Sequence, residues 1–194
     1  MKTLSFPRKF YFLLHLTVAA AACFLALRLF TPHPGAALPD YGEVPDFRLT
    51  DSAARPVSRG DLAGRPWIAD FIFTRCQGQC LVMNSQTKEL AAAVKGVPFI
   101  SFTADPEHDT PDVLAGYAET QGARGRDWKF LTGAREELSR ISAEMHFGAL
   151  GDPMMHSTRF VLVDGRHRIR GYYDSNDPES LDALKRDAKA LGAR

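Results

Sequence analysis

The chain has 194 residues, of which 45% are hydrophobic and 24% are charged. Its 24 basic and 23 acidic side chains nearly cancel, so there is no electrostatic reason to expect nucleic acid or an acidic polymer as a partner. Three cysteines are too few for a disulfide-stapled scaffold, so a hydrophobic core has to hold the fold together.

The first apolar segment, residues 10–30, predicts a single transmembrane helix. Its length matches the roughly 20 residues that cross the hydrocarbon core of a bilayer. Basic residues precede it, so we expect residues 1–9 in the cytoplasm and the rest of the chain outside it. The alternative is a cleaved signal peptide. A lipoprotein site at Cys23 is disfavoured because the apolar run continues beyond it, so we interpret Cys23 as a lipid-facing or helix-packing residue.

Residues 31–45 contain four prolines and two glycines, a composition typical of an extended tether. Residues 46–194 then predict one α/β domain with a mixed sheet. Strands are expected at 46–51, 57–58, 67–73, 97–103, 128–131, 159–164 and 168–173, and helices after Cys80, at 112–121, at 134–145 and from Asp177 or Ser180 to Leu191. The first two strands form an edge hairpin in this prediction. The order of elements is typical of a thioredoxin-like fold with an added N-terminal hairpin.

Two cysteines, Cys76 and Cys80, follow the apolar strand 67–73 at the point where the pattern becomes helical. A helix N-terminus presents unpaired N–H groups and a positive dipole potential, which favour thiolate over thiol. Thiolate is the form that binds soft metals and attacks disulfides. The pair therefore predicts a reactive site.

Four segments of the chain resemble motifs of the Sco/SenC family of membrane-tethered copper proteins. They are FTRC at 73–76 followed by the second cysteine at position 80, SFTADPEHDT at 101–110, WKFLTG at 128–133 and DPMMHS at 152–157. The resemblance covers about residues 45–190, with the segments in the family's order. The family usually has a proline after each cysteine, whereas this chain has Gln77 and Leu81.

The resemblance implies a copper metallochaperone anchored in a bacterial inner membrane, with its soluble domain in the periplasm. It implies that Cys76, Cys80 and His156 bind copper, as Cu(I) or Cu(II). The implied recipient is the CuA-bearing subunit of cytochrome c oxidase, or another copper enzyme. Independently of the family, two thiolates and one imidazole form a soft ligand set that suits copper. Met154 and Met155 could add a thioether ligand, although adjacent methionines are more often packing residues.

The same thiols permit other chemistry. A thiol–disulfide oxidoreductase would use Cys76 and Cys80 as catalytic residues to reduce cysteines of a copper-site target. Either function requires an external thiol reductant, because an oxidising compartment favours the disulfide. A structural disulfide, a zinc site and a peroxidase are further alternatives. We interpret Asp105 and Asp109 as turn and capping residues, with a surface role near the site implied by the family, and His108 and His146 as ordinary surface or core residues.

Overall fold

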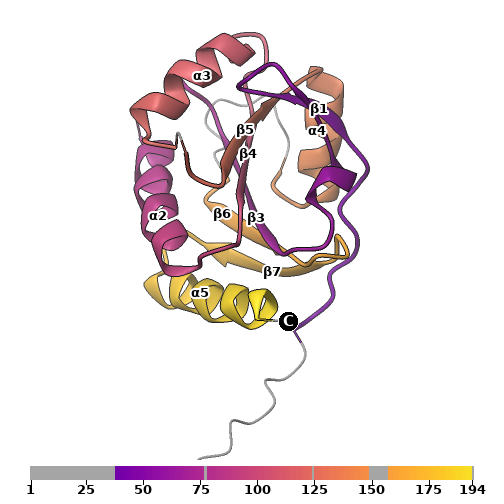
Figure 1. Ribbon diagram of the computed structural model, residues 1–194, viewed down its shortest axis with the longest axis vertical. Coiled ribbons are helices and arrows are strands. Elements are labelled where there is room, and N and C mark those ends of the chain that lie inside the picture. Colours follow the sequence, from indigo (N-terminus) through magenta and orange to yellow (C-terminus); the bar gives the residue numbers. More distant parts are fainter. Residues whose placement is uncertain (1–37, 77, 124, 149–156, 194) are drawn as a thin grey trace, which may run out of the picture. The chain divides into compact units, whose positions relative to one another are not determined.

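One mixed sheet of seven strands forms the centre of the domain, in the order β2-β1-β5-β4-β3-β6-β7. The computed structural model (Figure 1) describes residues 38–76, 78–123, 125–148 and 157–193. The strands are β1 Arg48–Asp51, β2 Pro56–Ser58, β3 Trp67–Ile72, β4 Phe99–Thr103, β5 Trp128–Thr132, β6 Arg159–Val163 and β7 Ile169–Asp174. β3, β4 and β5 are parallel, and the other neighbours are antiparallel. The predicted mixed sheet and edge hairpin are confirmed.

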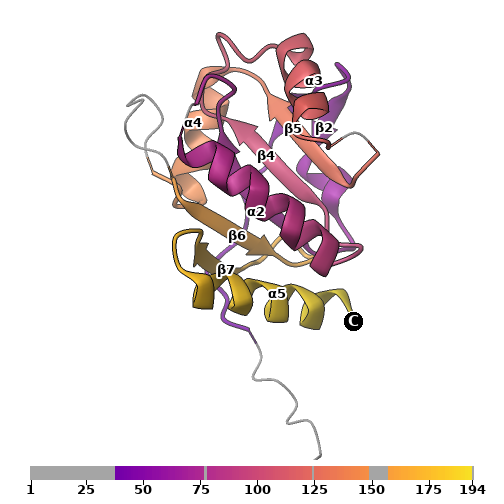
Figure 2. The ribbon, with the colours of Figure 1, turned by 90° about the vertical axis from the view of Figure 1, so that its left-hand side faces the viewer.

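Helices cover both faces of this sheet (Figures 1 and 2). The elements are α2 Gln79–Ala93, α3 Pro111–Thr120, α4 Arg135–Glu144, α5 Pro178–Gly192 and a short 3-10 helix, η1, Arg59–Leu62. Buried residues of α2, α3 and α5 share one hydrophobic cluster, and those of α4 and η1 share a second. The sequence predicted the four long helices but not η1.

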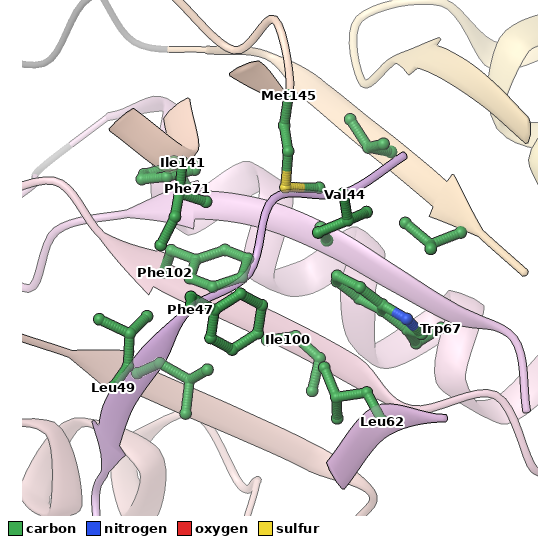
Figure 3. Close-up of a cluster of buried hydrophobic side chains, with 14 of the residues drawn as sticks. Val44, Phe47, Leu49, Leu62, Trp67, Phe71, Ile100, Phe102, Ile141 and Met145 are labelled. Atoms are coloured by element: carbon green, nitrogen blue, oxygen red, sulfur yellow. The ribbon is translucent and has the colours of Figure 1, made fainter. Parts of the chain in front are cut away.

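The central strand β3 is buried along its whole length and supplies both clusters. Because successive side chains of a strand point to opposite faces, Trp67 and Phe71 pack on the α4 side, whereas Ile68 and Ile72 pack on the α2 side. Figure 3 shows the α4-side cluster, in which the rings of Phe71 and Phe102 stack with centroids 5.3 Å apart. This two-sided burial fixes the position of the chain that leaves β3.

Side-chain caps define the starts of two helices. The Thr110 hydroxyl accepts a hydrogen bond from the Val113 N–H at 3.4 Å, and Pro111 occupies the first position of α3. At α5, Asp177 accepts from the Glu179 N–H at 3.0 Å. Of the two starts predicted for the last helix, Asp177 is therefore the one observed.

Residues 38–46, here called the N-terminal strap, lie against the β6–β7 hairpin. The Tyr41 N–H donates to the Ile169 carbonyl at 3.0 Å, and the Val44 N–H donates to the His167 carbonyl at 2.9 Å. Val44 is fully buried among the α4-side residues of Figure 3. The folded unit thus includes residues that the sequence analysis assigned to the tether.

The segments predicted as a membrane helix and as the start of the tether lie outside the described residues. Within the part of the chain that the structure describes, none of the helices combines the length and the apolar character needed to span a bilayer. The transmembrane helix at 10–30 stays a prediction.

Candidate metal centre

Cys76 and Cys80 lie beyond the carboxyl end of β3, where the chain turns into α2. The Cys76 N–H donates to the carbonyl of Phe73 at 3.2 Å, which closes a turn directly after the strand. Cys80 is the second residue of α2. The two side chains are 8% and 3% exposed, and neither sulfur is in a disulfide. The structure therefore places two reduced thiols together at one end of the central strand.

A hydrogen bond joins the two cysteines. The backbone N–H of Cys80 donates to Sγ of Cys76 across 3.4 Å. The first N–H groups of a helix have no partner within the helix, so Sγ of Cys76 satisfies one of them. This contact holds Cys76 against the start of α2, close to the second thiol, and both a shared metal ion and a disulfide need that proximity.

The expectation that the helix N-terminus favours thiolate is wrong for Cys80 in the metal-free protein. Burial raises the pKa of the Cys80 thiol to about 12, and the neighbouring Cys76 side chain adds to the increase. Desolvation of the anion thus outweighs the helix dipole at this position. A bound metal ion would reverse the balance, because a cation displaces the protons of its thiol ligands.

The turn before Cys76 is held by a buried carboxylate, that of Asp109. Its oxygens accept hydrogen bonds from the Thr74 N–H at 3.1 Å, the Thr74 hydroxyl at 2.5 Å and the Thr103 hydroxyl at 2.6 Å. The surface role expected for this residue is therefore wrong, because Asp109 is completely buried. Asp105 instead forms a partly exposed ion pair with Arg75 at 2.5 Å.

A second support reaches the thiol pair from the turn after β7. The side-chain amide of Gln79 donates to the Ser175 hydroxyl at 3.1 Å and to Oδ1 of Asn176 at 3.2 Å. Two turns further along α2, the Gln86 amide donates to the Ser175 carbonyl at 2.7 Å. The first two turns of α2 are thus fixed to the β7–α5 connection.

A buried carboxyl group on β3, that of Asp70, is a feature that the sequence reasoning missed. Asp70 is 1% exposed, and among the described residues its oxygens make no hydrogen bond of standard geometry, although the Ser101 hydroxyl lies near enough to lower its pKa. Burial raises its pKa to about 7. It lies close enough to Cys80 for its charge to raise the pKa of that thiol as well. The signal was present in the sequence, since Asp70 is the one charged residue within the apolar run 67–73.

The predicted third ligand, His156, lies outside the described residues, as do Met154 and Met155. The described chain resumes at Ser157, two residues before β6. Among the described residues, no three His, Cys, Asp or Glu side chains are grouped closely enough to hold a metal ion. His108 and His146 are exposed, in agreement with their interpretation as ordinary residues.

Together, the fold and the site define a thioredoxin-like domain with a pair of reduced cysteines between its central strand and the following helix. A family model described as SCO1/SenC matches residues 37–190. The chain therefore belongs to the SCO1/SenC family.

Individual relatives agree with this assignment. The chain is 30% identical over 158 residues to the SCO1 protein homolog of Bacillus subtilis (strain 168), covering 76% of this chain and 82% of that protein. BsSco is described as a member of the Sco family of cytochrome c oxidase assembly proteins, with a disulfide switch. Its structure is similar to that of this chain, with a TM-score of 0.68 and 27% sequence identity, and the match covers 81% of this chain and 96% of BsSco. ScoI of Bradyrhizobium japonicum, solved with copper bound, shares the fold, with a TM-score of 0.62 and 23% identity over 75% and 99% of the two chains.

Proposed function

We propose that this chain is a copper metallochaperone that binds Cu(I) or Cu(II) through Cys76, Cys80 and His156. Copper is its cargo, and the recipient is a copper-bearing subunit of cytochrome c oxidase or another copper enzyme. The description of BsSco as a cytochrome c oxidase assembly protein supports that recipient, and the copper-bound structure of ScoI supports the metal.

The observation that carries the proposal is the contact between the two reduced cysteines. The Cys80 N–H reaches Sγ of Cys76 at 3.4 Å, and neither thiol is in a disulfide. Thiolates are soft ligands that select copper over hard cations. Burial suits a transported ion as well, because a nearly water-free site protects the metal until a partner protein approaches.

The proposal includes the placement of the domain outside the cytoplasm. Residues 10–30 anchor the chain in a bacterial inner membrane, with residues 1–9 on the cytoplasmic side and the folded domain in the periplasm. The apolar length of residues 10–30 and the basic residues before them support this orientation. An external thiol reductant keeps the pair reduced in that compartment.

A second candidate function is favoured by the same two thiols. In a thiol–disulfide reductase, Cys76 and Cys80 would reduce the cysteines of a copper-site target and become a disulfide themselves. The observation in its favour is that both sulfurs are free and adjacent, and the disulfide switch of BsSco supports it. This function needs only two cysteines, whereas the metallochaperone needs His156 as well.

The test is an anaerobic copper titration of the reduced domain, residues 38–194, which folds around its own two hydrophobic clusters. We expect one copper ion per domain and no tight binding after Cys76→Ser or Cys80→Ser. The His156→Ala variant should bind roughly 10- to 100-fold more weakly and give a different Cu(II) spectrum. His108→Ala, which replaces an exposed histidine, is the matched control and should bind as the wild type does.

Two results of the copper titration would contradict the proposal that this chain is a metallochaperone. Unchanged stoichiometry and affinity in all three site variants would exclude the assigned ligands. Absence of binding at micromolar copper, with rapid thiol exchange retained, would favour the reductase instead.

A further inference from the structure

We propose that Asp109 is a positioning residue that sets the geometry of the thiol pair. It lies in the connection between β4 and α3. In the sequence, most of α2 and all of β4 stand between the cysteines and Asp109. The inference concerns the thiols themselves, so it holds whether their task is copper binding or disulfide exchange.

The environment of Asp109 shows that its carboxylate belongs to a built network. It is 0% exposed, and three donors surround it. One oxygen, Oδ2, accepts from both the Thr74 N–H and the Thr103 hydroxyl, and Oδ1 accepts from the Thr74 hydroxyl. A buried carboxylate is expensive unless such donors compensate for its lost hydration. The three donors therefore offset the cost of burying the Asp109 carboxylate.

The network connects the ends of two neighbouring parallel strands. Thr103 is the last residue of β4 and pairs in register with Ile72, the last residue of β3. Thr74 follows β3 by two residues and precedes Cys76 by two. The carboxylate of Asp109 thus ties the chain that leaves β3 to the fixed end of β4.

The position of Thr74 controls the cysteine turn. Thr74 lies inside the turn that the hydrogen bond from Cys76 to Phe73 closes. The backbone N–H and the hydroxyl of Thr74 both donate to the Asp109 carboxylate, and these two hydrogen bonds fix the position of Thr74. Without them the turn can rotate, and Sγ of Cys76 loses its defined place beside the Cys80 N–H. The other acidic residue of the connection, Asp105, has a partly exposed ion pair that constrains much less.

Disulfide formation measures this geometry without any metal. In a glutathione redox buffer, the Cys76 and Cys80 thiols react with one oxidised glutathione to give the intramolecular disulfide and two reduced glutathiones, which carry the two thiol protons. The equilibrium constant reports how well the fold holds the two sulfurs together. We expect Asp109→Ala to lower this constant by about fivefold or more, the effect of losing at least one hydrogen bond from the reactive geometry.

The conservative variant separates positioning from charge. In Asp109→Asn, the amide oxygen can still accept from the Thr74 N–H, and the amide nitrogen can donate to the Thr74 hydroxyl oxygen. We therefore expect its equilibrium constant to stay within about twofold of the wild type, since the number of hydrogen bonds is kept. An equal loss in the Asn and Ala variants would overturn the positioning role.

Asp51 provides the matched control for loss of a buried carboxylate. It is 3% exposed and accepts from the Ala53 N–H at 2.8 Å and the Arg55 N–H at 3.0 Å, in the β1–β2 turn. Asp51→Ala should lower stability and leave the thiol equilibrium unchanged. A shift as large as that of Asp109→Ala would show a general effect of destabilisation and refute the proposal.

Thr74→Val keeps the inference testable if Asp109→Ala does not fold. Valine has nearly the shape of threonine, keeps the backbone N–H bond to Asp109 and removes only the hydroxyl bond of 2.5 Å. We expect a smaller decrease in the same equilibrium constant. A wild-type value in a folded Thr74→Val protein would contradict the proposal.

Discussion

Cys76 accepts a hydrogen bond from the backbone N–H of Cys80, and this contact makes the two cysteines chemically unequal. Cys76 is the more exposed residue, at 8% against 3%. The Cys80 thiol, by contrast, has a pKa raised to about 12 by burial and by its neighbour. Cys80 is therefore the more deeply buried of the two residues, and burial favours its protonated form.

The first prediction concerns the order of alkylation. In the reduced, metal-free protein at pH 8, iodoacetamide should label Cys76 before Cys80, because thiolate is the reacting species and Cys80 is almost entirely protonated. The alkylation rate of Cys80 should rise by about tenfold per pH unit up to pH 11. Cys80 is still mostly protonated at pH 11, because its pKa is about 12. Peptide mass spectrometry at timed intervals measures both rates. Equal alkylation rates of Cys76 and Cys80 at pH 8 would contradict this prediction.

The second prediction follows from Asp70. Burial raises its pKa from 3.8 to about 7, so the folded state binds a proton that the unfolded state has lost. The stability that this proton supplies is fully present below pH 4 and is lost as the pH rises to 7. Between pH 5 and 8 the free energy of unfolding should therefore fall by about 3 kcal/mol from this group.

Urea unfolding of the wild type and of Asp70→Asn at pH 5 and pH 8 measures this contribution. The variant has no ionisable group at the site, so its stability should change less between the two pH values. Parallel pH dependence in the two proteins would show that Asp70 does not titrate in this range.

The third prediction concerns close backbone packing at Gly165. A Cβ atom on this residue would lie 2.8 Å from the carbonyl carbon of Gly64 and 2.9 Å from the backbone nitrogen of Arg65. Backbone atoms cannot move aside as a flexible side chain does, so Gly165→Ala should destabilise the protein by about 1–3 kcal/mol. Gly116→Ala is the control, because Gly116 lies within α3 with open space around it and should gain about 0.5–1 kcal/mol. Thermal unfolding of both variants tests the contrast.

The fourth prediction concerns the N-terminal strap. Val44 is 0% exposed, so Val44→Ala should lower the free energy of unfolding by about 1–3 kcal/mol. Val82, on α2, is 49% exposed, and Val82→Ala should change stability by less than about 0.5 kcal/mol. Urea unfolding of residues 38–194 compares the two. Equal effects would mean that the strap is not part of the cooperative fold.

Much of the fold could be predicted from the sequence, because its signals are local. Apolar runs of strand length revealed β3 and β4, and the helical pattern after Cys80 revealed α2. The four-residue spacing of Cys76 and Cys80 at a strand end was enough to predict a thiol site. These features depend on residues that are neighbours in the chain.

The features of the site that the sequence did not predict depend on contacts between segments that are distant in the chain. Asp109 and Thr74 are 35 residues apart, and only the register of β3 against β4 brings them together. The protonation of Cys80 likewise depends on burial beneath elements that the local sequence does not reveal. A helix N-terminus next to a cysteine indicated thiolate, but desolvation reversed that effect.

The N-terminal strap has a defined place relative to the thiols within the folded domain. It contacts Ile169 and His167, and the strand pairing places these residues beside Trp67, at the start of β3. The cysteines follow the other end of that strand, about 20 Å away for its six residues. A protein that contacts the thiols therefore meets the end of β3 opposite to the strap.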